Sequence, residues 1–361
     1  MSQIVCLSNA PWQAVPTRTQ QLMSRMGEAE VLFFEPPAPR GDRSYQKAGR
    51  KMRPGVTVYT LPPLWSNWEK PGLLFRRDCQ KTGAYIQSKM SAHGFREPLL
   101  WCTTPGDVHL LDYLAYQSLV YDCDRYWTQF PLSWESDLAL AADLIFAASD
   151  GLRDRLAPCC DNIALLPNGC NYLMFCRDDL GTPPGMAELR GPVLGFCGTI
   201  WKDLDLAPVL AIARRHPEWN VVLLGRGEHN PGLAALDALP NVYLLGRRPL
   251  LEVPEYLQRF HVCLDLCRTG FSGNDVVPCR VYEALSAGKP VVRFCFPGQV
   301  AEKPDVMLSA YSSEEFIRCC ESALERDAPW LPTQRRDYGA AAAWSLRADH
   351  VLQILESSCL T

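Results

Sequence analysis

An arginine and a glutamate stand three residues apart where a helix is expected to begin. Pro278 precedes Arg280 and Glu283, and Gly288 follows the last apolar residues of the segment. Proline at the start and glycine past the end are typical helix boundaries, and residues three apart share a helical face. Arg280 and the backbone N–H groups of a helix start can bind phosphates, while Glu283 can accept both ribose hydroxyls. The segment therefore suits a nucleoside diphosphate-sugar; a solvated surface ion pair is the alternative interpretation.

The bulk composition is that of a globular protein with room for two cores. The chain has 361 residues, of which 47% are hydrophobic and 21% charged, and its net charge is −4. This length accommodates two domains, and the negative charge argues against a nucleic-acid partner. No apolar stretch approaches a membrane span, and no basic leader precedes the first apolar residues. Most of the sixteen cysteines lie in apolar runs, which is typical of a reducing compartment; we expect a cytoplasmic protein.

One segment is strongly basic against this background. Residues 40–53 carry six arginines and lysines, with Asp42 as the sole acid. The composition favours a mobile surface loop. The alternative is peripheral contact with anionic lipid at the inner face of the membrane, or with an anionic acceptor.

Short apolar runs alternate with amphipathic segments along nearly the whole chain. This alternation predicts an α/β protein whose parallel sheets are covered by helices on both faces. We place an N-terminal domain at 1–172 and a C-terminal domain at 173–342, with a polar, Pro- and Gly-rich linker over about 177–191. The final segment, 338–360, reads as one long helix, and residues from about 343 to 361 can pack back on the first domain. The predicted strands are 4–8, 30–35, 56–61, 98–102, 119–122, 144–148, 163–166, 193–197, 220–224, 242–245, 262–266 and 291–296.

Several short motifs occur in an order typical of one enzyme family. They are residues 18–22, 31–37, 120–124, 166–169, 194–200, 241–249 and 277–292. In these motifs the chain resembles GT-B glycosyltransferases of the family 4-like group, which includes bacterial enzymes that build cell-surface polysaccharides. The resemblance covers most of the chain and implies two doubly wound, Rossmann-like domains facing each other across a cleft. It also implies retaining, metal-independent transfer of a sugar from a nucleotide-diphosphate donor to a glycan or lipid-linked acceptor hydroxyl.

The resemblance assigns donor-binding roles around the helix start. Glu283 matches the family's ribose-binding glutamate, and Asp275, eight residues earlier, matches the first acid of a Glu-x7-Glu pattern with aspartate in its place. In a second alignment, the loop 269–274 matches the sugar-contacting Gly-Phe-Gly loop. In both alignments the backbone of this loop is expected to face the donor sugar, at Gly273, Asn274, Val276 and Val277.

Cations for the diphosphate are expected after strands of the C-terminal half. Gly198 and Thr199 follow the strand 193–197, and Thr199 stands where relatives have an arginine. Lys202 is off the family's usual spacing, so Arg280 should carry more of the charge, with Arg226 as a third cation.

The base of the donor is expected at a different loop. Gly246 and Arg247 match the family's base-binding loop, where the backbone makes the contact. The donor should be a UDP- or GDP-linked sugar, and no other cofactor is expected.

The residues that bind the acceptor are expected in the N-terminal half. Asn9 and Trp12 follow the first strand and should line the cleft, although the family's glycine pair is missing there. His109 can hydrogen-bond the transferred sugar or act as a base; a structural role is the alternative. Asp122 and Asp124 imitate the metal-binding DxD of the other glycosyltransferase fold, and alternate strand residues share a face. Because the surrounding pattern is that of the metal-independent fold, we expect no metal and a role for one of them toward the acceptor.

Two other functions remain open at this level. A nucleotide-sugar epimerase on the same scaffold would bind the same donor without an acceptor. A catalytically silent nucleotide-sugar-binding partner subunit would tolerate the missing arginine and glycine pair. A Rossmann dehydrogenase is disfavoured, because no Gly-x-Gly-x-x-Gly follows a strand.

Overall fold

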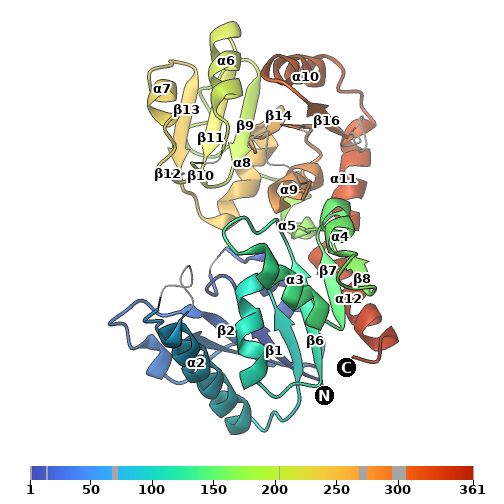
Figure 1. Cartoon of the computed structure of the whole chain (residues 1–361). Helices are drawn as coiled ribbons and strands as arrows, with labels where there is room; N and C mark the ends of the chain where they lie inside the picture. Colours follow the sequence, from blue (N-terminus) through green and yellow to red (C-terminus); the bar gives the residue numbers. More distant parts are fainter. Residues whose placement is uncertain are drawn as a thin grey trace. The chain divides into compact units, whose positions relative to one another are not determined.

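The computed structural model of the chain contains two compact units. It describes residues 2–13, 15–66, 72–202, 204–267, 275–294 and 306–360. Unit 1 comprises Met1–Pro167 and Ser345–Thr361, and unit 2 comprises Asn168–Trp344 (Figure 1). The predicted domain boundary at 172/173 lies shortly after this division.

Unit 1 is built on an eight-stranded sheet in the order β3-β4-β2-β1-β5-β6-β7-β8. All neighbouring strands are parallel except the edge pair β3 and β4. The strand order reverses between β1 and β5. The strands are β1 (Gln3–Leu7), β2 (Glu30–Pro37), β3 (Arg50–Arg53), β4 (Val56–Leu61), β5 (Leu99–Cys102), β6 (Ser118–Cys123), β7 (Leu144–Ala147) and β8 (Ile163–Leu165).

Helices flank this sheet, and the side chains of its central strands form the core of unit 1. Phe33, Trp101, Tyr121 and Phe146 are fully buried on β2, β5, β6 and β7, as expected for parallel strands covered on both faces. The helices are α1 (Arg18–Met23), η1 (Ser44–Gln46), α2 (Leu73–Ala92), η2 (Pro105–Tyr113), α3 (Leu132–Ala141), α4 (Asp150–Leu156) and α12 (Trp344–Ser357), which belongs to unit 1 from Ser345 onward.

Unit 2 contains a six-stranded, fully parallel sheet in the order β13-β11-β9-β14-β15-β16. Its order reverses between β9 and β14, as in a doubly wound nucleotide-binding fold. A second, two-stranded sheet pairs β10 with β12. The strands are β9 (Val193–Cys197), β10 (Ile200–Trp201), β11 (Asn220–Leu224), β12 (Gly227–Glu228), β13 (Val242–Gly246), β14 (Val262–Asp265), β15 (Val291–Phe294) and β16 (Met307–Ala310).

The helices of unit 2 bury two apolar clusters against this sheet. One cluster contains Phe196, Val209 and Phe316, and the other contains Tyr256 and Phe260. The helices are α5 (Tyr172–Phe175), α6 (Ala207–Arg215), α7 (Leu233–Asp237), η3 (Leu250–Glu252), α8 (Val253–Arg259), α9 (Cys279–Ser286), α10 (Ser313–Glu325) and α11 (Leu331–Ala341). No helix in the described ranges is long and apolar enough to cross a membrane.

The final segment differs from the single helix predicted for 338–360. Helix α11 ends at Ala341 and α12 begins at Trp344. Between them the backbone pairs with Cys170, whose N–H donates to Ala342 O and whose carbonyl accepts from Trp344 N, both at 3.0 Å. Gly169 permits this approach, because a Cβ there would lie 2.6 Å from Ala342 O. A partner distant in sequence therefore interrupts the helical periodicity.

Two further segments are more ordered than their composition predicts. The predicted linker 177–191 lies inside unit 2, where Met186 is buried and Tyr256 Oη donates to Pro184 O at 3.3 Å. The basic segment 40–53, expected to be a mobile loop, contains η1 and the strand β3. Tyr85 Oη of α2 donates to Tyr45 O of η1 at 2.8 Å. Side chains outside each segment therefore fix its backbone.

Candidate functional site

Charged side chains of unit 2 meet where its strand order reverses. Ligands of open α/β sheets bind beyond the carboxyl ends of the strands at such a reversal. Cys197 ends β9, and Asp265 ends the neighbouring β14. Helix α9 begins at Cys279 and directs Arg280 to this edge, where Arg280 Nη2 donates to Asp265 Oδ1 at 2.5 Å. The predicted cation therefore lies at the expected edge of the sheet.

The Arg280 guanidinium is held in place from several sides. Its Nη2 also lies 3.0 Å from Cys267 Sγ, and its Cζ is 5.3 Å from the centre of the Phe196 ring. Burial disfavours the charged form, but the Asp265 carboxylate outweighs it, so the pKa of Arg280 is raised. Its buried Nε has no partner among the described residues. Arg280 is thus a fixed positive charge whose Nε–H group can still donate a hydrogen bond.

Glu283 lies nearly one turn further along α9 and is half-buried. No hydrogen bond or ion pair reaches its carboxylate from the described part of the chain. Burial raises its pKa to about 7, although the charge of Arg280 acts in the opposite direction. A carboxylate that is buried without donors is costly to ionise. Glu283 therefore has acceptor capacity that a ligand with hydroxyl groups can use.

The loops after β9, β11 and β13 are joined by their backbones. Gly198 N donates to Leu224 O, and Gly225 N donates to Gly246 O, both at 2.9 Å. Gly225 has φ +156°, and a Cβ there would lie 1.8 Å from Gly198 O, so only glycine fits. The predicted donor residues Gly198 and Gly246 thus belong to one connected group of loops.

Four other residues predicted to bind the donor have exposed side chains on unit 2. Thr199, Lys202 and Arg247 are exposed, and Arg226 is 70% exposed with its Nε 3.6 Å from Glu228 Oε1. Within the described ranges, no hydrogen bond or ion pair fixes any of these side chains beside Arg280.

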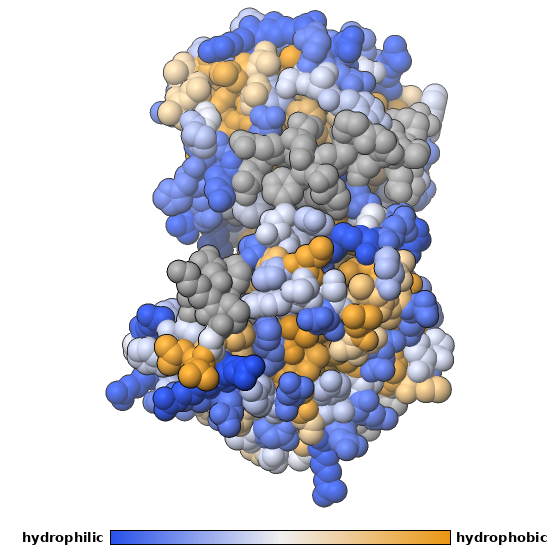
Figure 2. Space-filling model, viewed as in Figure 1, coloured by the Kyte–Doolittle hydropathy of each residue, from blue (hydrophilic) through white to orange (hydrophobic). Residues whose placement is uncertain are grey.

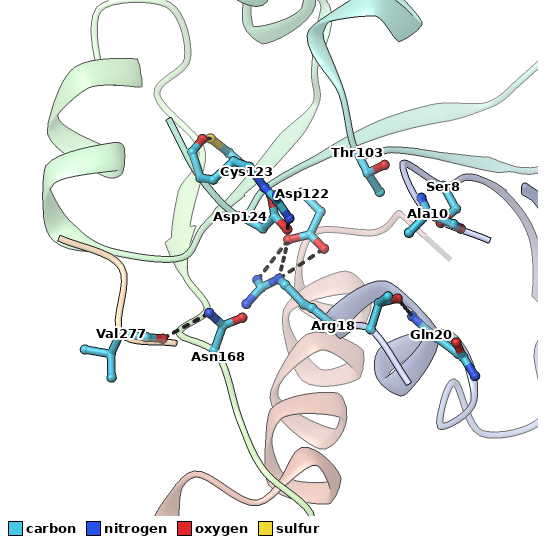
Figure 3. Close-up of polar contacts among 12 residues, drawn as sticks. Ser8, Ala10, Arg18, Gln20, Thr103, Asp122, Cys123, Asp124, Asn168 and Val277 are labelled. Atoms are coloured by element: carbon cyan, nitrogen blue, oxygen red, sulfur yellow. Dashed lines mark hydrogen bonds and ion pairs between the residues drawn. The ribbon is translucent and has the colours of Figure 1, made fainter. Parts of the chain in front are cut away.

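The segment that leads into α9 is anchored by an asparagine. Asn168 Nδ2 donates to Val277 O at 3.0 Å (Figure 3). Asp275, Val276 and Val277 are half-buried along this extended stretch. Gly273 and Asn274, also predicted to face the donor, lie outside the described residues.

In unit 1, the carboxylate of Asp122 is occupied by an arginine. Arg18 Nη2 donates to Asp122 Oδ1 at 2.8 Å, and Arg18 Nε lies 3.1 and 3.3 Å from the two carboxylate oxygens (Figure 3). The two residues are 5% and 1% exposed. An ion pair so far from water favours a structural role for Asp122, and its role toward the acceptor stays a prediction.

Asp124 is also paired. Arg125 Nε and Nη2 donate to its two oxygens, each at 2.8 Å. The Asp122-Cys123-Asp124 sequence therefore holds two separate ion pairs. Within the described ranges, no three His, Cys, Asp or Glu side chains are grouped as metal ligands.

His109 lies in an aromatic cluster on η2. Its ring packs edge-on against Phe75 and Trp134, with centroid distances of 4.9 and 4.2 Å. Burial lowers its pKa, with Asp137 acting in the opposite direction. Its buried Nε2 has no partner in the part of the chain that the structure describes. The imidazole is therefore neutral near pH 7, and a role as base stays a prediction.

The first loop of unit 1 follows β1 at the reversal of that sheet. Ser8 Oγ donates to Ala10 O at 2.7 Å, and Thr103 Oγ1, directly after β5, donates to Leu7 O at 2.8 Å. Trp12 N donates to Glu35 Oε1 at 2.8 Å. Asn9 and Trp12 are half-buried, and their predicted contact with an acceptor is not decided by this geometry.

Sequence reasoning did not identify the partners of the key charges. Asp265 was placed inside a predicted strand, and Arg18 was noted only as part of a motif. A charged residue at the end of an otherwise apolar strand was the available signal for Asp265. The pairing itself depends on which strands are neighbours in the sheet.

Comparisons of the sequence with known proteins match it to glycosyltransferases. Residues 191–326 match the family Glycosyl transferases group 1. Over 343 residues the chain is 28% identical to TuaH of Bacillus subtilis (strain 168), described as a candidate teichuronic acid biosynthesis glycosyltransferase, with 85% of this chain and 84% of that protein covered.

Solved structures share the fold along the whole chain. A sucrose-phosphate synthase from Thermosynechococcus elongatus superposes with a TM-score of 0.76 at 14% identity, covering 99% of both chains. A trehalose-6-phosphate synthase structure from E. coli, bound with UDP-2-fluoro glucose, gives 0.75 at 11% identity and covers 98% of this chain and 99% of that one. The chain is a glycosyltransferase with the GT-B fold, and its residues 191–326 match the group 1 glycosyl transferase family.

Proposed function

We propose that the chain transfers a hexose from a UDP- or GDP-linked donor to a hydroxyl of a glycan or lipid-linked acceptor. The observation that carries the proposal is Glu283, a half-buried carboxylate without a described partner, three residues from the fixed charge of Arg280. Surface polysaccharide synthesis is the proposed setting, because the relative TuaH is named for teichuronic acid biosynthesis. The UDP-2-fluoro glucose bound to the E. coli relative supports this donor class.

The proposed donor site uses α9 at its first turn. The ionised Glu283 would accept hydrogen bonds from the 2′- and 3′-hydroxyls of the ribose, since one carboxylate has two acceptor oxygens. The diphosphate would contact Arg280 and the backbone N–H groups after β9 and at the start of α9, where the helix dipole favours negative charge. Asp265 and Cys267 hold Arg280 in position before the donor arrives.

The proposed catalytic contribution is electrostatic. Charge develops on the leaving diphosphate as the bond to the sugar breaks, and a preorganised cation stabilises that charge. Arg280 supplies this cation, and the exposed Lys202 is a second candidate. The carboxylates of Asp122 and of Asp124 are each already in an ion pair. This supports a metal-independent reaction in which the chain's own cations neutralise the leaving diphosphate.

We propose retention of the anomeric configuration. A solved trehalose-6-phosphate synthase with the same fold, at a TM-score of 0.72, is described in terms of glycosyltransfer with retention. In unit 1, Asn9, Trp12 and the neutral imidazole of His109 are the proposed contacts for the acceptor.

The proposal is tested with a panel of nucleotide sugars. A ligand that binds the folded state raises the melting temperature, so the panel identifies the donor before any acceptor is known. We expect one UDP- or GDP-sugar to stabilise the protein and its sugar to be transferred in the presence of a chelator. Stabilisation by no member of the panel, or an epimerised nucleotide sugar formed from donor alone, would contradict the proposal. Activity lost with chelator and restored by manganese would refute metal independence.

A further inference from the structure

The start of helix α2 exposes large apolar side chains. Leu73 and Leu74 in its first turn are 86% and 61% exposed, and Trp65, just before the helix, is 58% exposed. Single exposed apolar residues are ordinary, but a group of them marks a surface that binds something. In Figure 2 the corresponding corner of unit 1 shows a hydrophobic patch directly beside strongly hydrophilic atoms.

The exposed tryptophan is held against α2 by a buried carboxylate. Asp78 Oδ2 accepts hydrogen bonds from Trp65 N at 2.8 Å, Ser66 N at 2.7 Å and Ser66 Oγ at 2.7 Å. Leu74 and Asp78 are four residues apart, so they share one side of the helix. Asp78 therefore fixes the backbone at Trp65 beside the first two turns of α2.

Arginines surround these apolar side chains. Arg40 Nη2 donates to Trp65 O at 2.8 Å, and its guanidinium lies 5.7 Å from the centre of the Trp65 ring. Arg76 and Arg77 on α2 are exposed, and neither side chain has an ion-pair partner among the described residues. The contact of Tyr85 with Tyr45 keeps the rest of the basic segment 40–53 beside the same helix.

We propose that this surface, made of Arg40, Trp65, Leu73, Leu74, Arg76 and Arg77, binds the anionic surface of a lipid bilayer. The transfer of leucine side chains from water to the edge of the acyl-chain region is favourable in free energy, and tryptophan prefers the level of the lipid headgroups. The arginines would contact lipid phosphates. Because the whole chain has a net charge of −4, the attraction depends on this local cluster. The proposal does not depend on the transfer reaction.

The test measures binding of the full chain to vesicles of phosphatidylcholine with or without phosphatidylglycerol. We expect sedimentation with the anionic vesicles, and weakening as salt screens the arginines. The double variant L73S/L74S should reduce the partition coefficient about tenfold or more, since two apolar side chains no longer enter the bilayer. R76Q/R77Q should reduce it on the order of tenfold, and only for anionic vesicles.

Leu132 and Leu140 of α3 provide a matched control, because they are 68% and 65% exposed in the same unit. L132S/L140S should bind vesicles like the unchanged protein. An unchanged melting temperature shows that L73S/L74S is folded. The proposal is overturned if anionic vesicles do not bind, or if L132S/L140S loses binding as much as L73S/L74S does. It is also overturned if L73S/L74S dissolves a dimer detected by light scattering, which would assign the surface to a second copy of the chain.

Discussion

The two sheets place an arginine and a carboxylate at comparable edges, but they use them differently. In unit 1, Arg18 and Asp122 lie beyond 90% burial and satisfy each other. In unit 2, Arg280 is paired with Asp265, while Glu283 on the same helix has no partner in the described ranges. Burial without a partner raises the pKa of Glu283 to about 7.

The difference is between a charge pair that is satisfied within the protein and a carboxylate that is left for a ligand under our proposal. A buried carboxylate is stable when an arginine neutralises it, as for Asp122, and costly when it stands alone. A fold keeps such a cost where a ligand will remove it. We therefore propose the lone carboxylate of Glu283, rather than the ion-paired one of Asp122, as the functional one.

The largest effect is expected from a substitution that breaks the Arg18–Asp122 ion pair. Asp122→Ala leaves the buried Arg18 without its counter-charge, which should destabilise unit 1 by about 3–5 kcal/mol. Denaturant unfolding at neutral pH measures this loss. Affinity for the donor should not change at temperatures where the variant is folded. Full stability together with lost turnover would instead make Asp122 a functional residue.

The second largest effect is expected from removing the carboxylate of Glu283. Glu283→Ala should weaken binding of the nucleotide-sugar donor about a hundredfold, since two hydrogen bonds to a charged group are lost. Calorimetric titration gives the affinity. Glu252→Ala, which removes a half-buried acid before α8, is the control and should bind normally. Donor affinity that survives Glu283→Ala would remove the ribose role.

A third change sharpens the role of Arg280. Arg280→Lys keeps the charge but loses the planar fork that bonds Asp265, so turnover should fall roughly tenfold. Arg214→Lys on the exposed face of α6 is the matched control. A drop in melting temperature with unchanged turnover would make Arg280 as structural as Arg18.

The last expected effect, which concerns stability and not donor binding or turnover, is a pH dependence. The pKa of Glu283 is raised in the folded state to about 7 from its ordinary value near 4.5. The protonated Glu283 side chain therefore makes its full contribution to the free energy of unfolding below pH 4.5. This contribution is lost as the pH rises through 7. Glu283→Gln should remove this loss, making unit 2 more stable than the original by on the order of 1–3 kcal/mol at pH 8. Melting curves at pH 5 and pH 8 compare the two proteins; equal pH profiles would contradict the raised pKa.

Local patterns predicted most of the sheet. The bounds of β4, β9 and β11 equal those predicted from apolar runs. Features that depend on distant partners were missed. The edge strand β3 carries four exposed residues and pairs with β4, and the backbone of Cys170 interrupts the final helix.

The candidate site followed the same rule. The start of α9, with Arg280 and Glu283, could be predicted because proline, glycine and residue spacing are local signals. The pairings of Arg280 with Asp265 and of Arg18 with Asp122 could not, since they join residues 15 and 104 positions apart. Lys202 matched no local rule beyond its charge, and its side chain is exposed.

One binding experiment tests the central claim, that Glu283 accepts the ribose hydroxyls of the donor. Calorimetry compares the nucleoside diphosphate of the identified donor with its 2′,3′-dideoxy analogue, on the original protein and on Glu283→Ala. Removing the hydroxyls should weaken binding to the original protein about as much as removing the carboxylate does, and should have little further effect on the variant. Equal losses for the analogue on both proteins would show that the hydroxyls and Glu283 do not interact, and would contradict the account.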